Sequence, residues 1–216
     1  VAHGADAGIC LDGDADRLIM ADEAGTIIDG DQILGCLALA MQERGTLAKN
    51  AVVGTVMTNR GLETRLGKAG INLHRVAVGD RYILEKMRQD GLNLGGEPSG
   101  HMLMTDFARS GDGLLTALQM LTLLKTSGKK ASKLFNSFSP NPQRLENLRG
   151  INPAILQDQK LQSDLANIEA NLNGKGRVLV RPSGTEALVR VMVEAESEAL
   201  LTEAMDALIL RITAEA

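Results

Sequence analysis

Apolar residues follow two alternating patterns through the first 125 positions, namely short extended runs and longer stripes with helical spacing. The extended runs predict strands at 7–11, 18–21, 27–28, 52–57, 73–78, 92–96 and 102–105. The stripes predict helices at 31–44, 61–68, 79–87 and 112–124, the first with Asp31 as its N-cap. This alternation is typical of an α/β domain with a mixed, largely parallel sheet.

A second pattern follows a stretch rich in Ser, Lys, Asn and Pro at 125–141, which we interpret as a linker with a domain boundary near 130–141. Beyond it the sequence predicts strands at 145–151, 177–181 and 188–195 and helices at 161–172 and 198–216. Antiparallel strands covered by two helices form a smaller α+β domain. In the last strand, alternation places the valines on one face and Arg190 and Glu194 on the other.

Composition narrows the classes of function. The chain has 216 residues with 44% apolar and 23% charged, which is ordinary for a globular protein. A net charge of −4 argues against nucleic-acid binding, and no apolar run is long enough to span a bilayer. Without a signal peptide we expect a cytoplasmic protein, in which Cys10 and Cys36 are buried free thiols. A start without Met, within a few residues of a strand, predicts that an N-terminal portion is absent.

The densest chemistry lies in Leu11-Asp12-Gly13-Asp14-Ala15-Asp16-Arg17, between two predicted strands of a buried sheet. Three neighbouring carboxylates repel one another, and a divalent cation relieves that repulsion. Oxygen ligands suit magnesium, calcium or manganese. An acidic surface turn is the plainer alternative. An EF-hand is excluded because its sixth position needs Gly, where this loop has Arg17.

Two further polar loops stand out. In Gly95-Gly96-Glu97-Pro98-Ser99-Gly100-His101, a carboxylate, a hydroxyl and an imidazole lie between glycines, which suits sugar hydroxyls as well as it suits a polar turn. In Arg181-Pro182-Ser183-Gly184-Thr185-Glu186, two hydroxyls and a Gly lie beside Arg181 and Arg190. That set favours a phosphate site over a plain hairpin turn, because guanidinium groups match phosphate oxygens.

Together the three loops resemble the α-D-phosphohexomutase superfamily, which carries an Asp-Gly-Asp-x-Asp-Arg metal loop, a Gly-Glu-x-Ser-Gly-His sugar loop and an Arg-Pro-Ser-Gly-Thr-Glu phosphate loop. All three occur here in that order, at 12–17, 96–101 and 181–186. Ala15 and the run Val78-Gly79-Asp80-Arg81-Tyr82 are most similar to the bacterial phosphoglucosamine mutase branch. Two positions depart from it, with Pro98 where that branch has Gln and Ala187 where Pro is common.

The resemblance implies a division into the end of domain 2 with the metal loop (1–25), domain 3 with the sugar loop (26–135) and a TBP-like domain 4 with the phosphate loop (136–216). The family's active-site Ser, in a Ser-His-Asn-Pro motif of the first domain, has no counterpart in this sequence. The partners implied are a hexosamine phosphate and the missing N-terminal domains, and a homodimer stays open. We expect no nucleic-acid or membrane partner.

The resemblance also implies residue roles. Asp12, Asp14 and Asp16 would hold Mg²⁺. Arg17 and His101 are the candidates for proton transfer or charge stabilisation, and the remaining candidates would bind substrate: Arg81, Glu97, Ser99, His101, Arg181, Ser183, Gly184, Thr185 and Arg190.

The activity implied is that of an isomerase which interconverts glucosamine 6-phosphate and glucosamine 1-phosphate through a phosphoserine and a bisphosphorylated sugar, and this sequence alone is expected to be inactive. A phosphoglucomutase or phosphomannomutase of the same superfamily, and a non-catalytic sugar-phosphate-binding module, are the alternatives.

Overall fold

The computed structural model describes residues 1–183 and 188–214, and it divides the chain into two compact units, Val1–Pro140 and Asn141–Ala216. Within the described residues, no helix is long and apolar enough to cross a membrane.

The first unit begins with a small antiparallel sheet in the order β1-β2-β3. Its strands are β1 (Ala7–Leu11), β2 (Leu18–Asp22) and β3 (Ile27–Ile28). In β2 the alternate residues Leu18 and Met20 are buried, whereas three central residues of β1, Ile9 among them, are exposed. The expectation of a buried sheet on both sides of the acidic loop is therefore correct for β2 and wrong for β1 within this chain.

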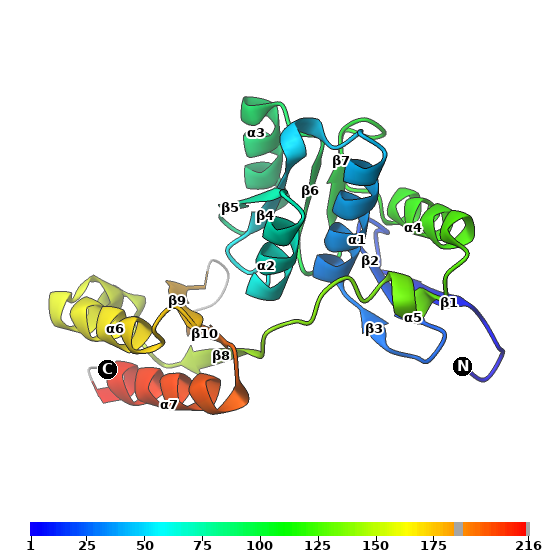
Figure 1. The fold of residues 1–216 in the computed structure, drawn as a ribbon. Helices are drawn as coiled ribbons and strands as arrows, with labels where there is room; N and C mark the ends of the chain where they lie inside the picture. The colour runs from blue at the N-terminus through cyan, green and yellow to red at the C-terminus, as the bar shows by residue number, and fades with distance from the viewer. Residues whose placement is uncertain (184–187, 215–216) are drawn as a thin grey trace. The chain divides into compact units, whose positions relative to one another are not determined.

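A four-stranded sheet in the order β5-β4-β6-β7 forms the centre of the first unit (Figure 1). Its strands are β4 (Ala51–Thr55), β5 (Asn72–Val76), β6 (Leu94–Gly96) and β7 (Met102–Met104). β4 pairs in parallel with β5 and β6, and β7 is antiparallel to β6. This is the mixed, largely parallel sheet that the alternating strands and helices predicted.

Helices cover both faces of that sheet. Val52 and Leu94 belong to a core with α1 (Gly30–Glu43), α2 (Arg60–Lys68) and α4 (Gly113–Ser127). Ala51 and Val53, one pleat away, pack on the opposite face against Ile83 and Met87 of α3 (Asp80–Asp90). A short 3₁₀ turn, η1 (Ala48–Asn50), precedes β4.

The N-cap of α1 is Asp29, whose side chain accepts the N–H of Gln32 at 2.9 Å. The prediction of Asp31 as the cap was wrong by two residues, because both carboxylates precede the same apolar stripe. Asp31 is instead buried in the first turn, where its Oδ2 accepts the N–H of Asn59 at 2.8 Å. It thereby fixes the start of α2.

Part of the predicted linker packs on the first core. It holds a short helix, α5 (Ala131–Leu134), and Phe135, which is fully buried. Gln32 holds the following segment through hydrogen bonds to the carbonyl of Phe138 and the N–H of Ser137, 2.9 and 2.8 Å long. The polar composition of residues 125–141 hides this packing, because only three large apolar side chains of the segment contact the core.

The second unit is a three-stranded antiparallel sheet in the order β8-β10-β9 with two helices packed on it (Figure 1). Its elements are β8 (Gln143–Arg149), η2 (Pro153–Gln157), α6 (Gln159–Asn171), β9 (Gly176–Pro182), β10 (Leu188–Ala195) and α7 (Glu198–Ala214). The valines of β10 pack against Leu161 of α6 and Met205 of α7. Glu194, on the face of β10 opposite the valines, is fully buried and paired with Arg177 at 2.6 Å.

The two thiols differ in environment. Both cysteines are free, as predicted, but Cys10 is exposed and only Cys36 is buried. Cys10 lies on the exposed strand β1, so the burial predicted for it was wrong. Burial raises the pKa of the Cys36 thiol to about 12.

Candidate functional site

The acidic loop between β1 and β2 folds back on its own first residue. Asp12 accepts the N–H of Arg17 on Oδ1 at 3.2 Å, and its carbonyl accepts the N–H of Ala15 at the same distance. Ala15 adopts a left-handed backbone with φ of 60°. The resulting curl places carboxylate oxygens of Asp12, Asp14 and Asp16 all within 4.8 Å of one another.

The charges in this loop are unbalanced. Three carboxylates face one guanidinium, Arg17, whose Nε lies 3.6 Å from Asp12 and 3.8 Å from Asp16. With their oxygens within 4.8 Å of one another, each carboxylate pair repels by roughly 1 kcal/mol at the dielectric of water and roughly 3.5 kcal/mol at the effective dielectric near a protein surface. The buried Oδ1 of Asp16 has no hydrogen-bond partner among the described residues. A set of convergent carboxylate oxygens with a residual charge of two fits a hard divalent cation.

The acidic loop is joined directly to the loop at 96–101. Arg17 and His101 form an antiparallel backbone bridge, and Leu18 donates its N–H to the carbonyl of Gly100 at 3.1 Å. The Nδ1 atom of His101 lies 3.0 Å from Oδ2 of Asp16. Residues far apart in the sequence therefore form one continuous site wall, which the sequence motifs alone did not place together.

Glycines make this close junction possible. A Cβ on Gly100 would lie 2.8 Å from the carbonyl carbon of Leu18 and closer still to its oxygen, and Gly100 has φ of +92°. A Cβ on Gly113, the first residue of α4, would lie 2.6 Å from the carbonyl oxygen of Arg17. Gly113 also donates its N–H to the carbonyl of Ala15 at 2.9 Å. Contacts of this kind leave room for hydrogen alone at Cα.

His101 is enclosed rather than open to solvent. The residue is 7% exposed, and its ring packs against the backbone of Gly111. Its Nε2 has no hydrogen-bond partner within the ranges 1–183 and 188–214. Since its other nitrogen faces Asp16, the ring fixes the orientation of that carboxylate.

Glu97 is held from two sides. Its Oε1 accepts the N–H of Gly79 at 3.0 Å, and its Oε2 accepts the Ser99 hydroxyl at 3.4 Å. Each oxygen retains acceptor capacity for a further hydroxyl. Gly79 is the N-cap of α3, with φ of 131°, so the segment before Arg81 is tied to the 96–101 loop. We did not expect this contact, although Gly79 lies in the run that marked the family resemblance.

Arg81 forms its described contacts within its own helix. Its Nε donates to Glu85 at 2.9 Å, one turn along α3. This hydrogen bond raises the pKa of Arg81 above its ordinary value. The guanidinium is mostly exposed, which leaves its remaining N–H groups accessible to a ligand.

The two arginines of the predicted phosphate site lie in the second unit, Arg181 on β9 and Arg190 on β10. Arg181 and Arg190 are direct cross-strand partners, so their side chains lie on one face of the sheet. Burial, with the positive charge of Arg190 as a second cause, lowers the pKa of Arg181. Like charges directly opposite destabilise a sheet, and an anion offsets that cost. Ser183 donates its N–H to the carbonyl of Leu188 at 2.9 Å, while Gly184 and Thr185 lie outside the described residues.

Comparisons with known proteins find relatives over nearly the whole chain. Residues 29–141 match the model of the phosphoglucomutase/phosphomannomutase alpha/beta/alpha domain III, and residues 142–211 match that of the C-terminal domain of the same family. Phosphoglucosamine mutases from Roseobacter denitrificans and Ruegeria pomeroyi are each 53% identical over 97% of the chain. The chain spans 47% of the length of each.

Solved structures show the same fold. A phosphoglucomutase/phosphomannomutase family protein from Burkholderia thailandensis is 25% identical with a TM-score of 0.78, over 98% of this chain and 47% of that one. An N-acetylphosphoglucosamine mutase of Aspergillus fumigatus, solved with GlcNAc-6P and magnesium, is 20% identical with a TM-score of 0.76. That match covers 94% of this chain and 48% of that protein.

Proposed function

Because the chain belongs to the phosphoglucomutase/phosphomannomutase family, we propose that it forms the second half of a phosphoglucosamine mutase. The whole enzyme would be a cytoplasmic isomerase that interconverts glucosamine 6-phosphate and glucosamine 1-phosphate for cell-wall precursors. It would act through a phosphoserine outside this sequence and a bisphosphorylated sugar. The phosphoglucosamine mutases that are 51% and 53% identical to this chain support an amino-sugar substrate over glucose or mannose phosphates.

The observation that supports sugar-phosphate chemistry most directly is the junction of the acidic loop and the 96–101 loop. The Arg17–His101 bridge holds carboxylates suited to a cation beside Glu97 and Ser99, which suit hydroxyls. We assign Asp12, Asp14 and Asp16 as Mg²⁺ ligands. Bound Mg²⁺ would stabilise negative charge on a phosphoryl group in transfer.

The other roles follow from exposure and partners. Glu97 and Ser99 would accept and donate hydrogen bonds to sugar hydroxyls. Arg17, with a half-exposed side chain, is the candidate for charge stabilisation or proton transfer, and exposed Arg81 would help hold the substrate. For His101, burial and the Asp16 contact favour positioning of a ligand over direct proton transfer. Arg181, Ser183, Gly184, Thr185 and Arg190 would bind the phosphate group of the substrate.

The test is an NMR titration of the 216-residue chain with glucosamine 1-phosphate, glucose 1-phosphate and mannose 1-phosphate, each with magnesium. We expect the Glu97 and Ser99 amides to shift more with the amino sugar than with the other two. Equal shifts would contradict the amino-sugar assignment and favour a phosphoglucomutase or phosphomannomutase. A response to none of the three, or one that inorganic phosphate reproduces in full, would count against a sugar site in this chain.

A further inference from the structure

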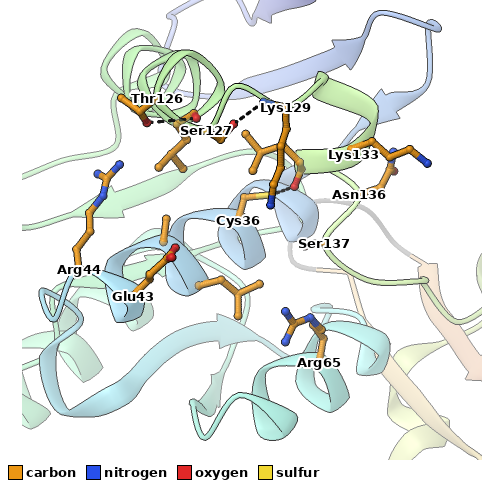
Figure 2. A pocket seen from close by; sticks show the side chains of 14 residues that line it. Cys36, Glu43, Arg44, Arg65, Thr126, Ser127, Lys129, Lys133, Asn136 and Ser137 are labelled. Carbon is orange, nitrogen blue, oxygen red and sulfur yellow. Dashed lines mark hydrogen bonds between the residues drawn. The ribbon is translucent and has the colours of Figure 1, made fainter.

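We propose that the first unit carries a second anion-binding site, distinct from the loops described above, that takes a small phosphorylated compound with at least two anionic groups. The site is a cavity of about 620 Å³ between the last turns of α1 and α4, helix α2 and residues 129–137 (Figure 2). None of its lining residues belongs to the acidic loop, the 96–101 loop or the β9–β10 hairpin. Its size lies in the range of small-molecule pockets.

The charge of the lining carries the argument. Four cationic side chains line the cavity, from three separate parts of the unit: Arg44, Arg65, Lys129 and Lys133. Glu43 is the single carboxylate among the lining residues, which leaves a formal charge of +3. No ion pair is described for any of the four cations within residues 1–183 and 188–214. Like charges around one concavity repel one another, which destabilises the empty cavity. An anion bound among them is attracted to each cation and makes the total electrostatic energy favourable.

Two of the four cationic side chains reach into the cavity. In Figure 2 the side chains of Lys129 and Arg65 approach the cavity from opposite sides, and Arg44 lies toward one end. The hydroxyls here are already used, since Thr126 donates to the carbonyl of Thr122 and Ser127 to that of Leu124. Cationic N–H groups are therefore the main donors that a ligand meets. The cavity should therefore select ligands by their negative charge. The planar guanidinium groups of its arginines match the oxygens of a phosphate group.

The wall between the cations is apolar and inert. Leu39, Leu123 and Leu134 contribute hydrocarbon surface, which suits the carbon skeleton of a phosphorylated metabolite. Cys36 also lines the cavity, but its thiol has two carbonyl acceptors in reach for its single proton, those of Leu134 at 3.3 Å and Phe135 at 3.4 Å. With a pKa of about 12, the thiol stays neutral near pH 7 and adds no negative charge.

The experiment is calorimetric titration of the 216-residue chain with inorganic tripolyphosphate, in buffer freed of divalent cations by a chelating resin. We expect saturable binding that weakens as sodium chloride rises from 50 to 300 mM, because the contacts are ionic. The Arg65→Gln/Lys129→Gln double variant should lose about tenfold or more in affinity, from roughly 0.7 kcal/mol for each charge removed. NMR shifts should map to the amides of Cys36 and Asn136.

Matched controls separate this site from general charge effects and from the proposed function. Lys68→Gln removes one exposed charge at the end of α2, outside the cavity lining, and should change affinity less than twofold. Arg190→Gln tests the hairpin as the source of binding. No binding by the wild type, equal loss in the Lys68 variant, or loss confined to Arg190→Gln would each overturn the proposal. If the double variant unfolds early, Lys133→Gln alone should still weaken binding about threefold.

Discussion

Replacement of Gly100 by Ala should break the junction between the acidic loop and the 96–101 loop. The added Cβ would lie 2.8 Å from the carbonyl carbon of Leu18, and the residue would keep a left-handed φ of +92°. The backbone conformation costs about 1–2 kcal/mol and the forced overpacking about 1–3 kcal/mol. Together they predict a loss of about 2–5 kcal/mol in the free energy of unfolding of the first unit.

The assay uses a favourable feature of the sequence. Tyr82 is the only tyrosine, there is no tryptophan, and Tyr82 lies in the first unit, so tyrosine fluorescence reports the unfolding of that unit. A loss of this size should lower its Tm by roughly 6–15 °C, at about 3 °C per kcal/mol for a domain of this length.

Gly67→Ala is the matched control. Gly67 lies exposed in α2, and nothing lies within 4 Å of the position that an added methyl group would take. Ala should therefore leave stability unchanged or raise it by up to about 1 kcal/mol. If Gly100→Ala unfolds within 2 °C of Gly67→Ala, the close approach of the two loops is not as described. The two loops would then not form one continuous wall of the site.

The remaining predictions concern the second unit, the thiols and turnover. Arg177→Met should remove the 2.6 Å ion pair to the fully buried Glu194 and lower the free energy of unfolding of the second unit by about 3–5 kcal/mol, measured by urea denaturation. The double variant Arg177→Met/Glu194→Gln should recover part of that loss, and a loss under about 1 kcal/mol in the single variant would contradict the prediction. Iodoacetamide at pH 8 should modify exposed Cys10 and spare Cys36, as mass spectrometry would show. Burial raises the pKa of Cys36 from 9.0 to about 12, so the unfolded chain loses this proton at a lower pH than the folded one. The contribution of the thiol to the free energy of unfolding is therefore present below pH 9 and lost as pH rises toward 12. Cys36→Ala should remove that part of the pH dependence. The 216-residue chain, which contains no Ser-His-Asn-Pro motif, should show no mutase turnover in a coupled assay, and turnover in a preparation free of host enzyme would contradict the proposed mechanism.

Much of the fold could be predicted from the sequence because its strands and helices differ clearly in apolar spacing. The α4 helix begins after Asp112 as expected, with the carboxylate accepting the N–H of Leu115. The order β5-β4-β6-β7 could not be read from the pattern, because strand neighbours depend on long-range pairing. The burial of Ala131 and Phe135 was missed because short polar-rich segments give no periodic signal.

The candidate site shows a similar division. Its motifs predict a chemistry for each loop, because clustered carboxylates and paired arginines carry physical costs that a ligand offsets. The contact between Asp16 and His101 could not be predicted, because it joins residues 85 positions apart. Nor does composition reveal the cationic cavity, whose lining residues lie on separate elements of a chain with a net charge of −4.

The central claim is that the acidic loop and the 96–101 loop form one cation-dependent site. The most direct measurement is an NMR titration of the 216-residue chain with magnesium chloride, which follows the amides of Asp14, Ser99 and His101. We predict binding in the roughly millimolar range that shifts all three amides, is abolished in Asp14→Asn, and persists in the exposed-acid control Asp6→Asn. Shifts confined to 12–17, or equal binding in Asp14→Asn, would contradict the claim.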